Sequence, residues 1–315
     1  MSTGISAVMS NNEAYASRLH ALEAGLQTLP DKPEETAETA FAALCHLAAG
    51  QALSAQAVAG LPLPELNAAQ LGKLDALIAR RIQGTPLAHL TGRQAFMGLE
   101  MLAGPQALIP RQETELLAKA AINQLKQMAA SLNRPLLVVD VCTGSGNLAL
   151  AMAHAYPSAT VWASDLSAQA VELAQANARH LNFADRVRCR VGDLLAPFED
   201  EAFLGQVDLL LCNPPYISSG KLDTMPAEII QHEPTLAFDG GPFGIRILQK
   251  LMREAPRFVR PGGWLGFEVG LGQGPAVGQW LARTGQFGPP LEIEDQHGQV
   301  RSLMAQRLTS QAETT

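Results

Sequence analysis

The chain has 315 residues, of which 47% are hydrophobic and 17% charged, a composition that can bury a large core and excludes wholesale disorder. Its formal net charge of −7 disfavours direct binding to nucleic-acid phosphates. No apolar run is long enough for a membrane helix and no secretion signal is recognisable, so we expect a cytoplasmic protein without a membrane partner. The four cysteines form no C-x-x-C pair and the histidines are scattered, which predicts neither disulfides nor a metal site.

The first third of the chain is rich in Ala, Leu, Gln and Glu, and its apolar residues recur at helical spacing. Prolines separate the periodic segments, and Gly84-Thr85-Pro86 ends the last of them. We therefore expect a small helical domain over residues 1–92, followed by a hairpin-like connector over residues 93–111. Helices are expected at residues 12–28, 34–49, 53–59 and 66–82.

From about residue 112 strand-like and helix-like segments alternate, beginning with a helix over residues 113–131. Such alternation is typical of an α/β fold with a doubly wound, mostly parallel sheet, here predicted for residues 112–308. The polar residues 309–315 are predicted to be a frayed tail. Strands are expected at 136–141, 159–164, 187–191, 207–212, 264–269, 291–294 and 301–307, and helices at 146–155, 167–181, 243–258 and 273–284.

A glycine-containing loop, D-V-C-T-G-S-G from Asp140 to Gly146, follows the first strand of this sheet. Its glycines Gly144 and Gly146 allow a sharp turn and a close approach of the backbone to a ligand, and the next helix offers free N–H groups. Asp165 ends the second strand, where a carboxylate can bind both ribose hydroxyls of a nucleoside. A purely structural turn is equally compatible with the two glycines alone.

Two nucleoside cofactors are compatible with this loop. The pattern G-x-G-x-x-A suits a dinucleotide, with Asp165 as the acid that binds ribose. Asp140, however, is awkward beside a pyrophosphate and suits the cationic amino-acid end of S-adenosylmethionine. A third acid, Asp193, could accept a hydrogen bond from the adenine amine while Leu194 packs on the ring. Three acids after three successive strands favour S-adenosylmethionine over a dinucleotide.

The tetrapeptide Asn213-Pro214-Pro215-Tyr216 directly follows the apolar fourth strand, at the edge where an α/β active site is expected. Two prolines fix the backbone and remove two donors, which leaves the carbonyls of Asn213 and Pro214 free to accept hydrogen bonds. The Asn213 carboxamide and the flat ring of Tyr216 complete a set that suits a planar group bearing N–H donors. A stiff turn with an incidental tyrosine is the alternative.

Together the two motifs resemble class I methyltransferases that act on amino or amide nitrogen. The segment L-I-P-R-Q-E-T-E from Leu108 to Glu115 also resembles the I-P-R-P-E-T-E segment of the protein-(glutamine-N5) methyltransferases, the HemK/PrmC type that modifies peptide-chain release factors. This resemblance covers roughly residues 75–308 and includes the later pair Phe267-Glu268. Gln112 stands where that family commonly has proline, and Cys142 where it has glycine.

The resemblance implies S-adenosylmethionine as the methyl donor and a glutamine of a release factor as the acceptor. It also implies that Asn213 and Pro214 bind the amide NH2 and that Tyr216 packs against the acceptor. Because the α/β segment carries all the expected cofactor residues, the helical domain is free to recognise the acceptor, and we expect it to do so. Arg111 and Glu233 are candidates for shaping the acceptor site. A small metabolite or another protein remains an alternative acceptor, whereas a DNA adenine methyltransferase, a dehydrogenase or a non-catalytic binding module is disfavoured.

The predicted catalytic residues are Asn213, Pro214 and Tyr216. The predicted substrate-binding residues are Asn213, Pro214, Pro215, Tyr216, Arg111 and Glu233. The predicted cofactor-binding residues are Asp140, Cys142, Thr143, Gly144, Ser145, Gly146, Asp165, Asp193, Leu194 and Asn213.

Overall fold

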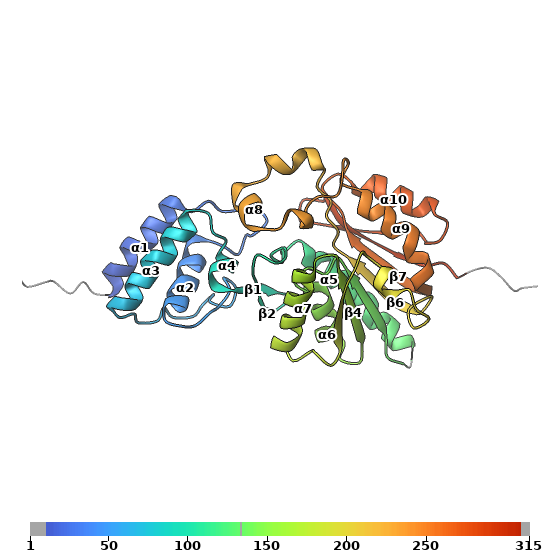
Figure 1. Ribbon diagram of the computed structural model, residues 1–315, viewed down its shortest axis with the longest axis horizontal. Coiled ribbons are helices and arrows are strands. Elements are labelled where there is room, and N and C mark those ends of the chain that lie inside the picture. The colour runs from blue at the N-terminus through green and yellow to red at the C-terminus, as the bar shows by residue number, and fades with distance from the viewer. Residues whose placement is uncertain (1–10, 133, 310–315) are drawn as a thin grey trace, which may run out of the picture. The chain divides into compact units, whose positions relative to one another are not determined.

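The computed structural model describes residues 11–132 and 134–309, which divide into two compact units between Ala95 and Phe96 (Figure 1). Apart from Thr309, the predicted frayed tail lies outside the described residues. No helix in these two described stretches combines the length and the apolar character that a membrane crossing requires.

The first unit is helical, as the periodicity predicts. Thr36 and Asn67 cap two of its helices reciprocally, because each side chain accepts a backbone N–H while the side chain at the third helical position bonds back. The apolar faces of the helices meet around Leu22, Leu44 and Leu74, which are fully buried. The helices are α1 (Asn11–Gly25), α2 (Ala37–Ala48), α3 (Ala68–Ile82) and α4 (Leu87–Thr91).

The prediction of a helix over residues 53–59 is wrong, because residues 55–60 form consecutive turns. The Ser54 hydroxyl accepts the backbone N–H of Ala57 at 3.2 Å, a local bond that competes with helical pairing. The segment is also too short to offset the cost of nucleating a helix.

A two-stranded hairpin lies inside the predicted connector. Its strands are β1 (Arg93–Phe96) and β2 (Leu99–Leu102), so the turn falls at Met97 and Gly98, which both adopt positive φ. The remainder of the predicted connector, over residues 103–111, contains no strand.

The second unit is built on a seven-stranded sheet of order β5-β4-β3-β6-β7-β9-β8, counted over the described residues. The first five strands of this order are parallel to one another. Strand β9 pairs antiparallel with β7, and the edge strand β8 pairs antiparallel with β9. The predicted doubly wound α/β class is therefore confirmed. The strands are β3 (Leu137–Val141), β4 (Thr160–Asp165), β5 (Val187–Val191), β6 (Val207–Cys212), β7 (Val259–Glu268), β8 (Leu291–Glu294) and β9 (Val300–Gln306).

Helices cover both faces of this sheet and bury one apolar cluster on each. Because side chains alternate along a strand, neighbours such as Val138 and Val139 of β3 belong to opposite clusters. The helices on the Val138 face are α5 (Thr114–Ser131), α6 (Asn147–Ala155) and α7 (Ala168–His180), and those on the Val139 face are α9 (Arg246–Phe258) and α10 (Gly274–Arg283).

The segment between β6 and α9 was not assigned any element from the sequence, yet it contains several short ones. These elements are η2 (Ser219–Thr224), α8 (Ala227–His232) and η3 (Thr235–Ala237). One further short helix, η1 (Ala196–Phe198), precedes β6. Helix α9 itself begins at Arg246, three residues later than predicted.

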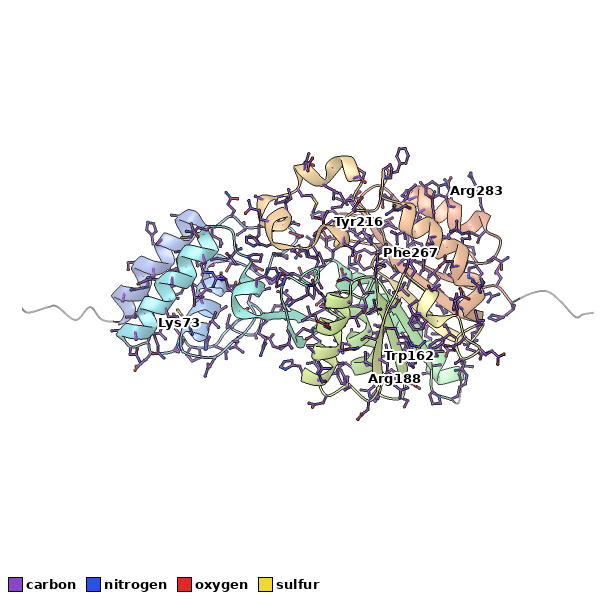
Figure 2. All side chains as sticks on the ribbon, viewed as in Figure 1. Lys73, Trp162, Arg188, Tyr216, Phe267 and Arg283 are labelled. Atoms are coloured by element: carbon purple, nitrogen blue, oxygen red, sulfur yellow. The ribbon has the colours of Figure 1, made fainter. Side chains whose placement is uncertain are left out.

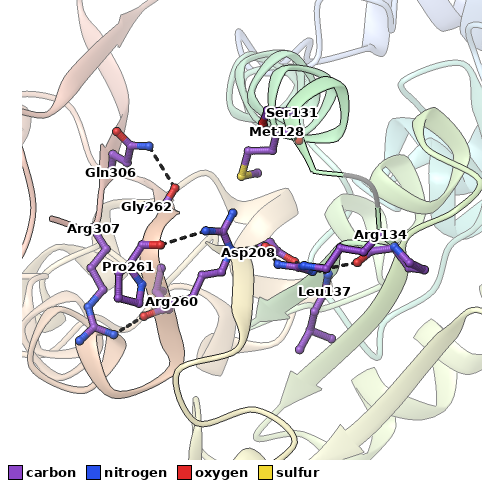
Figure 3. Close-up of polar contacts among 12 residues, drawn as sticks. Met128, Ser131, Arg134, Leu137, Asp208, Arg260, Pro261, Gly262, Gln306 and Arg307 are labelled. Atoms are coloured by element: carbon purple, nitrogen blue, oxygen red, sulfur yellow. Dashed lines mark hydrogen bonds and ion pairs between the residues drawn. The ribbon is translucent and has the colours of Figure 1, made fainter. Parts of the chain in front are cut away.

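Charged side chains protect the ends and the edge of the sheet. At the amino end of β6, the buried carboxylate of Asp208 accepts hydrogen bonds from Arg134, Arg260 and the Leu137 N–H (Figure 3). On the edge strand β5, the Arg188 guanidinium lies 5.3 Å from the ring centroid of Trp162 (Figure 2). A charged side chain on an edge strand disfavours pairing with a further strand.

Candidate active site

A pocket opens at the carboxyl ends of the parallel strands, where the second unit supplies every lining residue. It encloses about 1130 Å³ when the space open to solvent is included. The loops after β3, β4, β5 and β6 line it together with the segment before α5 and the segment before α9. In open α/β sheets this edge is where ligands bind.

The glycine loop follows β3 and has the conformation that its glycines permit. Gly144 and Gly146 have φ of 55° and 87°, in the left-handed region that favours glycine. A Cβ on Gly146 would also lie only 3.2 Å from the Cβ of Ala174, so helix α7 packs against the loop at this point. Thr143, Gly144 and Ser145 line the pocket.

Asp140 lies beneath this loop and does not line the pocket. Its Oδ2 accepts hydrogen bonds from the Thr143 hydroxyl at 2.6 Å and the Ala149 N–H at 3.2 Å, so it holds both ends of the loop. Its Oδ1 has no hydrogen-bond partner among the described residues. Burial raises the pKa of Asp140 to about 7, against the effect of these two hydrogen bonds.

Asp165 lies at the end of β4 and lines the pocket. Its carboxylate accepts the Gly144 N–H and the Ser167 N–H, each at 2.9 Å, and so joins the glycine loop to the start of α7. Burial raises the pKa of Asp165, and backbone hydrogen bonds from Ser167, Gly144 and Leu166 oppose that rise. Each oxygen keeps a lone pair that can accept a further donor.

Asp193 and Leu194 line the pocket after β5. Leu194 is buried and has a φ of 51°, and its carbonyl accepts the Ser164 hydroxyl at 2.7 Å. The half-exposed Asp193 carboxylate lies 2.5 Å from the Lys250 ammonium. A ligand donor at Asp193 would therefore share that carboxylate with Lys250.

Two further loop residues carry polar atoms of interest. Ser145 is buried and lines the pocket, and its hydroxyl has no partner among the described residues. Cys142 also lines the pocket with a φ of 57°, in the position where the resembling family has glycine. Burial and the adjacent Cys142 thiol raise the pKa of Cys212 well above its usual value.

The Asn213–Tyr216 motif divides between the pocket and the protein interior. Asn213 and Pro215 line the pocket, whereas Pro214 and Tyr216 do not. The Tyr216 hydroxyl donates to Glu268 Oε1 at 2.9 Å, and Figure 2 shows Tyr216 near Phe267, the residue before Glu268 on β7. The phenol is therefore part of an internal network.

This network joins α5, the motif and β7. The Asn213 Nδ2 donates to the Thr114 hydroxyl at 3.1 Å, and that hydroxyl donates to Glu268 Oε2 at 2.7 Å. Glu268 is 1% exposed, and burial raises its pKa although the hydrogen bonds from Thr114 and Tyr216 oppose the rise. Arg301, which is paired with Glu113, further opposes it.

Arg111 and Glu233 form a buried ion pair with each other. The second Glu233 oxygen accepts the Ile109 N–H at 2.9 Å, and Arg111 donates to the Ile109 carbonyl at 3.2 Å. The pair thus fastens the segment before α5 to the segment after α8. Of the two side chains, Arg111 alone lines the pocket.

Sequence reasoning missed much of the lining. Thr114 was visible only as part of the I-P-R-P-E-T-E-like segment, and Leu236 and Ala237 lie in a segment that carries no periodic or motif signal. The lining residues without a predicted role are Gln106, Ala107, Leu108, Pro110, Thr114, Asn147, Leu166, Ser167, Gln169, Ala170, Pro234, Leu236, Ala237, Asp239, Arg246 and Ile247.

Comparison with known proteins identifies the family. The methyltransferase small domain model matches residues 119–255. The release factor glutamine methyltransferase of Moorella thermoacetica is 39% identical over 243 residues, which cover 77% of this chain and 82% of that protein. The chain belongs to the release factor glutamine methyltransferase family. A second member, from Gloeobacter violaceus, is 38% identical and covers 75% of this chain and 79% of its own length.

The resemblance drawn from the motifs is therefore confirmed at the level of the family. Among solved structures, the hMettl16 catalytic domain in complex with a 3′UTR hairpin matches with a TM-score of 0.53 and 15% identity. That match covers 76% of this chain and 83% of the other and supports the fold alone. No three His, Cys, Asp or Glu side chains of the described residues are grouped so that they could hold a metal ion.

Proposed function

We propose that this chain transfers a methyl group from S-adenosylmethionine to the side-chain amide nitrogen of a glutamine in a peptide-chain release factor. The name of its relatives supports the acceptor, and the family supports the methyl transfer. The observation that carries the proposal is the Asn213 carboxamide, which lines the pocket beside the glycine loop. A carboxamide there can bind another amide.

The pocket residues suit the methyl donor. A buried Ser145 hydroxyl without a partner among the described residues and the remaining lone pairs of Asp165 offer polar contacts for a nucleoside. Leu166 and Leu194 supply apolar surface for a flat base. Asp140 lies below the loop, so its unpaired oxygen would contribute through the field that it creates for a cationic ligand.

The donor supplies a methyl group that is already activated by its bond to a sulfonium. The chain therefore has to align the acceptor nitrogen with the methyl carbon and to exclude competing geometries. Asn213 Oδ1 would accept one N–H group of the amide and orient it. The family resemblance implies the Pro214 carbonyl for the other N–H group, although Pro214 is not among the residues that line the pocket. Tyr216 would support this arrangement from behind, through its hydrogen bond to Glu268. No general base is required, because the nitrogen loses a proton readily once it carries the methyl group.

Methyl transfer to purified release factor tests the proposal. The enzyme, isotope-labelled S-adenosylmethionine and release factor would be incubated, and the peptides analysed by mass spectrometry for one added methyl group on a glutamine. A release factor with that glutamine changed to glutamate provides the matched control, because it lacks the amide. Label in another protein or only in small molecules would contradict the proposed acceptor, and no label in any acceptor would contradict the activity.

A further inference from the structure

We infer that Thr114 and Glu268 are positioning residues that fix the orientation of the Asn213 carboxamide, so that its oxygen and not its NH2 faces the acceptor. The orientation follows from the hydrogen bonds of the chain itself. Its consequence for catalysis rests on the proposed function, in which the reacting group is an amide NH2.

The three side chains form one unbroken chain of hydrogen bonds. Asn213 Nδ2 lies 3.1 Å from Thr114 Oγ1, and Thr114 Oγ1 lies 2.7 Å from Glu268 Oε2. Thr114 and Glu268 are each 1% exposed, so water cannot substitute for either partner. The other carboxylate oxygen, Oε1, accepts the Tyr216 hydroxyl at 2.9 Å.

Counting protons sets the direction of each bond. An ionised carboxylate can only accept, so both hydroxyls that contact Glu268 must donate to it. The single proton of the Thr114 hydroxyl is then used, and this oxygen can only accept from Asn213. The carboxamide must therefore turn its NH2 toward Thr114, which leaves Oδ1 free; no described residue donates to it.

The free oxygen determines which acceptor group fits. An amide NH2 offers two donors and needs acceptors around it, so Asn213 Oδ1 is complementary to it. The flipped carboxamide would present donors to donors, which is repulsive. The buried carboxylate of Glu268 thus sets the hydrogen-bonding character of the pocket without contacting the acceptor.

Protonation of Glu268 would remove this constraint. A neutral carboxyl donates from one oxygen, so the Thr114 proton can turn to Asn213 Oδ1 and the carboxamide can flip. The charged groups that face Glu268 are Arg301 from β9 and Glu113 at the start of α5, and they act in opposite directions on its pKa. Because the ionised form is competent, the rate should rise with pH through the pKa of Glu268 and then level off.

Substitutions at Thr114 test the hydroxyl. Thr114→Val keeps the shape and removes both hydrogen bonds, and we expect turnover to fall at least tenfold with little change in S-adenosylmethionine affinity. Thr114→Ser keeps the hydroxyl and should restore most of the lost rate. Thr284→Val is the matched control, because this hydroxyl bonds only to backbone groups, the Leu281 carbonyl and the Gln286 N–H, and lies outside the pocket.

The pH dependence of turnover tests the carboxylate. Glu268→Gln removes the titrating group, so the loss of activity at acidic pH that depends on Glu268 should disappear and the rate should be low throughout. Tyr216→Phe removes one hydrogen bond to the charged form, so the midpoint should move to higher pH. If Glu268 has only a structural role, both variants should lower the rate and leave the midpoint of the pH profile at its wild-type value. That result would overturn the inference.

A measurement without any acceptor separates this inference from the proposed function. The side-chain amide signal of Asn213 in a ¹⁵N-labelled enzyme, assigned by its loss in Asn213→Asp, should titrate with pH in the wild type and not in Glu268→Gln. It should also shift in Thr114→Val and remain unchanged in Thr284→Val. If neither Glu268→Gln nor Thr114→Val changes the Asn213 signal, the inference is overturned even if glutamine is methylated. A responsive signal in an enzyme that methylates no glutamine would refute the proposed function alone.

Discussion

Asn213 is the residue at which the proposed chemistry depends on one oxygen atom. Asn213→Ala should reduce the single-turnover rate of methyl transfer about 10²-fold, because interactions with the reacting group are made mainly in the transition state. The affinity for S-adenosylmethionine, measured by calorimetry, should change much less. Asn182→Gly is a suitable control, because Asn182 is exposed and its φ of 60° is compatible with glycine.

A near-normal rate for Asn213→Ala under saturating cofactor would contradict this role and leave the N-P-P-Y motif as a stiff turn. A large loss of cofactor affinity instead would assign Asn213 to the donor half of the site.

At the scale of single elements, the turn after β3 contains a testable anomaly. Cys142 has a φ of 57°, which is unfavourable for a residue with a Cβ. Cys142→Gly should therefore be more stable than Cys142→Ala by about 1 kcal/mol in urea unfolding, because both lose the thiol but only glycine relieves the backbone.

Cys189, a strand residue of β5 whose φ is not positive, provides the control. There we expect the reverse order, with Cys189→Ala more stable than Cys189→Gly. Equal stability of the two Cys142 variants would indicate that the left-handed conformation is not strained.

The accuracy of the element predictions depended on how local the signal was. Residues 207–212 were predicted as a strand because a continuous apolar run is typical of one buried on both faces, and β6 has those bounds. The turns at residues 55–60 were missed because helical periodicity over a few residues cannot reveal that Ser54 captures a backbone N–H. The short elements between β6 and α9 gave no periodic signal at all.

The site was predictable to the extent that motifs mark strand ends. The positions of Asp165 and Asn213 at the pocket follow from their places at the end of β4 and directly after β6. The burial of Asp140 does not follow, because a sequence cannot tell which side of a loop a carboxylate occupies. The contact between Thr114 and Glu268 spans 154 residues, and no local pattern predicts it.

At the scale of the whole molecule, the second unit supplies every residue that lines the pocket. We propose that it carries the cofactor site and that the helical unit serves acceptor recognition. A chain beginning at Leu90, which keeps the hairpin, should bind S-adenosylmethionine with nearly full-length affinity but fail to methylate release factor. Circular dichroism would establish that it is folded, and full-rate methylation by this chain would contradict the division of roles.

Stability of the second unit should depend on the buried charge of Asp208. Burial alone would raise its pKa, but the hydrogen bonds from Arg134 and Arg260 outweigh burial and hold it below the usual 3.8. Asp208→Asn keeps the shape but weakens the hydrogen bonds from both guanidinium groups, which are partly exposed and can be hydrated, so it should lower the free energy of unfolding by about 1.5–3 kcal/mol at neutral pH.

The lowered pKa also sets the sign of the pH effect. A carboxyl with a depressed pKa stabilises the fold above its unfolded value, and this stabilisation is lost as pH falls through the folded value. The difference between wild type and Asp208→Asn should therefore shrink below about pH 4, as measured by urea unfolding. Asp200→Asn, in a half-exposed pair with Arg190, should change stability little at any pH.

The antiparallel strand β9 has a consequence for the order in which the site is completed. Because β9 runs opposite to its neighbours, its beginning lies beside the end of β7, with Ser302 opposite Glu268. Arg301 thereby reaches Glu113, 188 residues earlier in the chain. During synthesis the glycine loop, Asp165 and Asn213 emerge from the ribosome long before Arg301. The donor half of the site can thus form early in synthesis, whereas the surroundings of Glu268 are completed only after β9 has emerged.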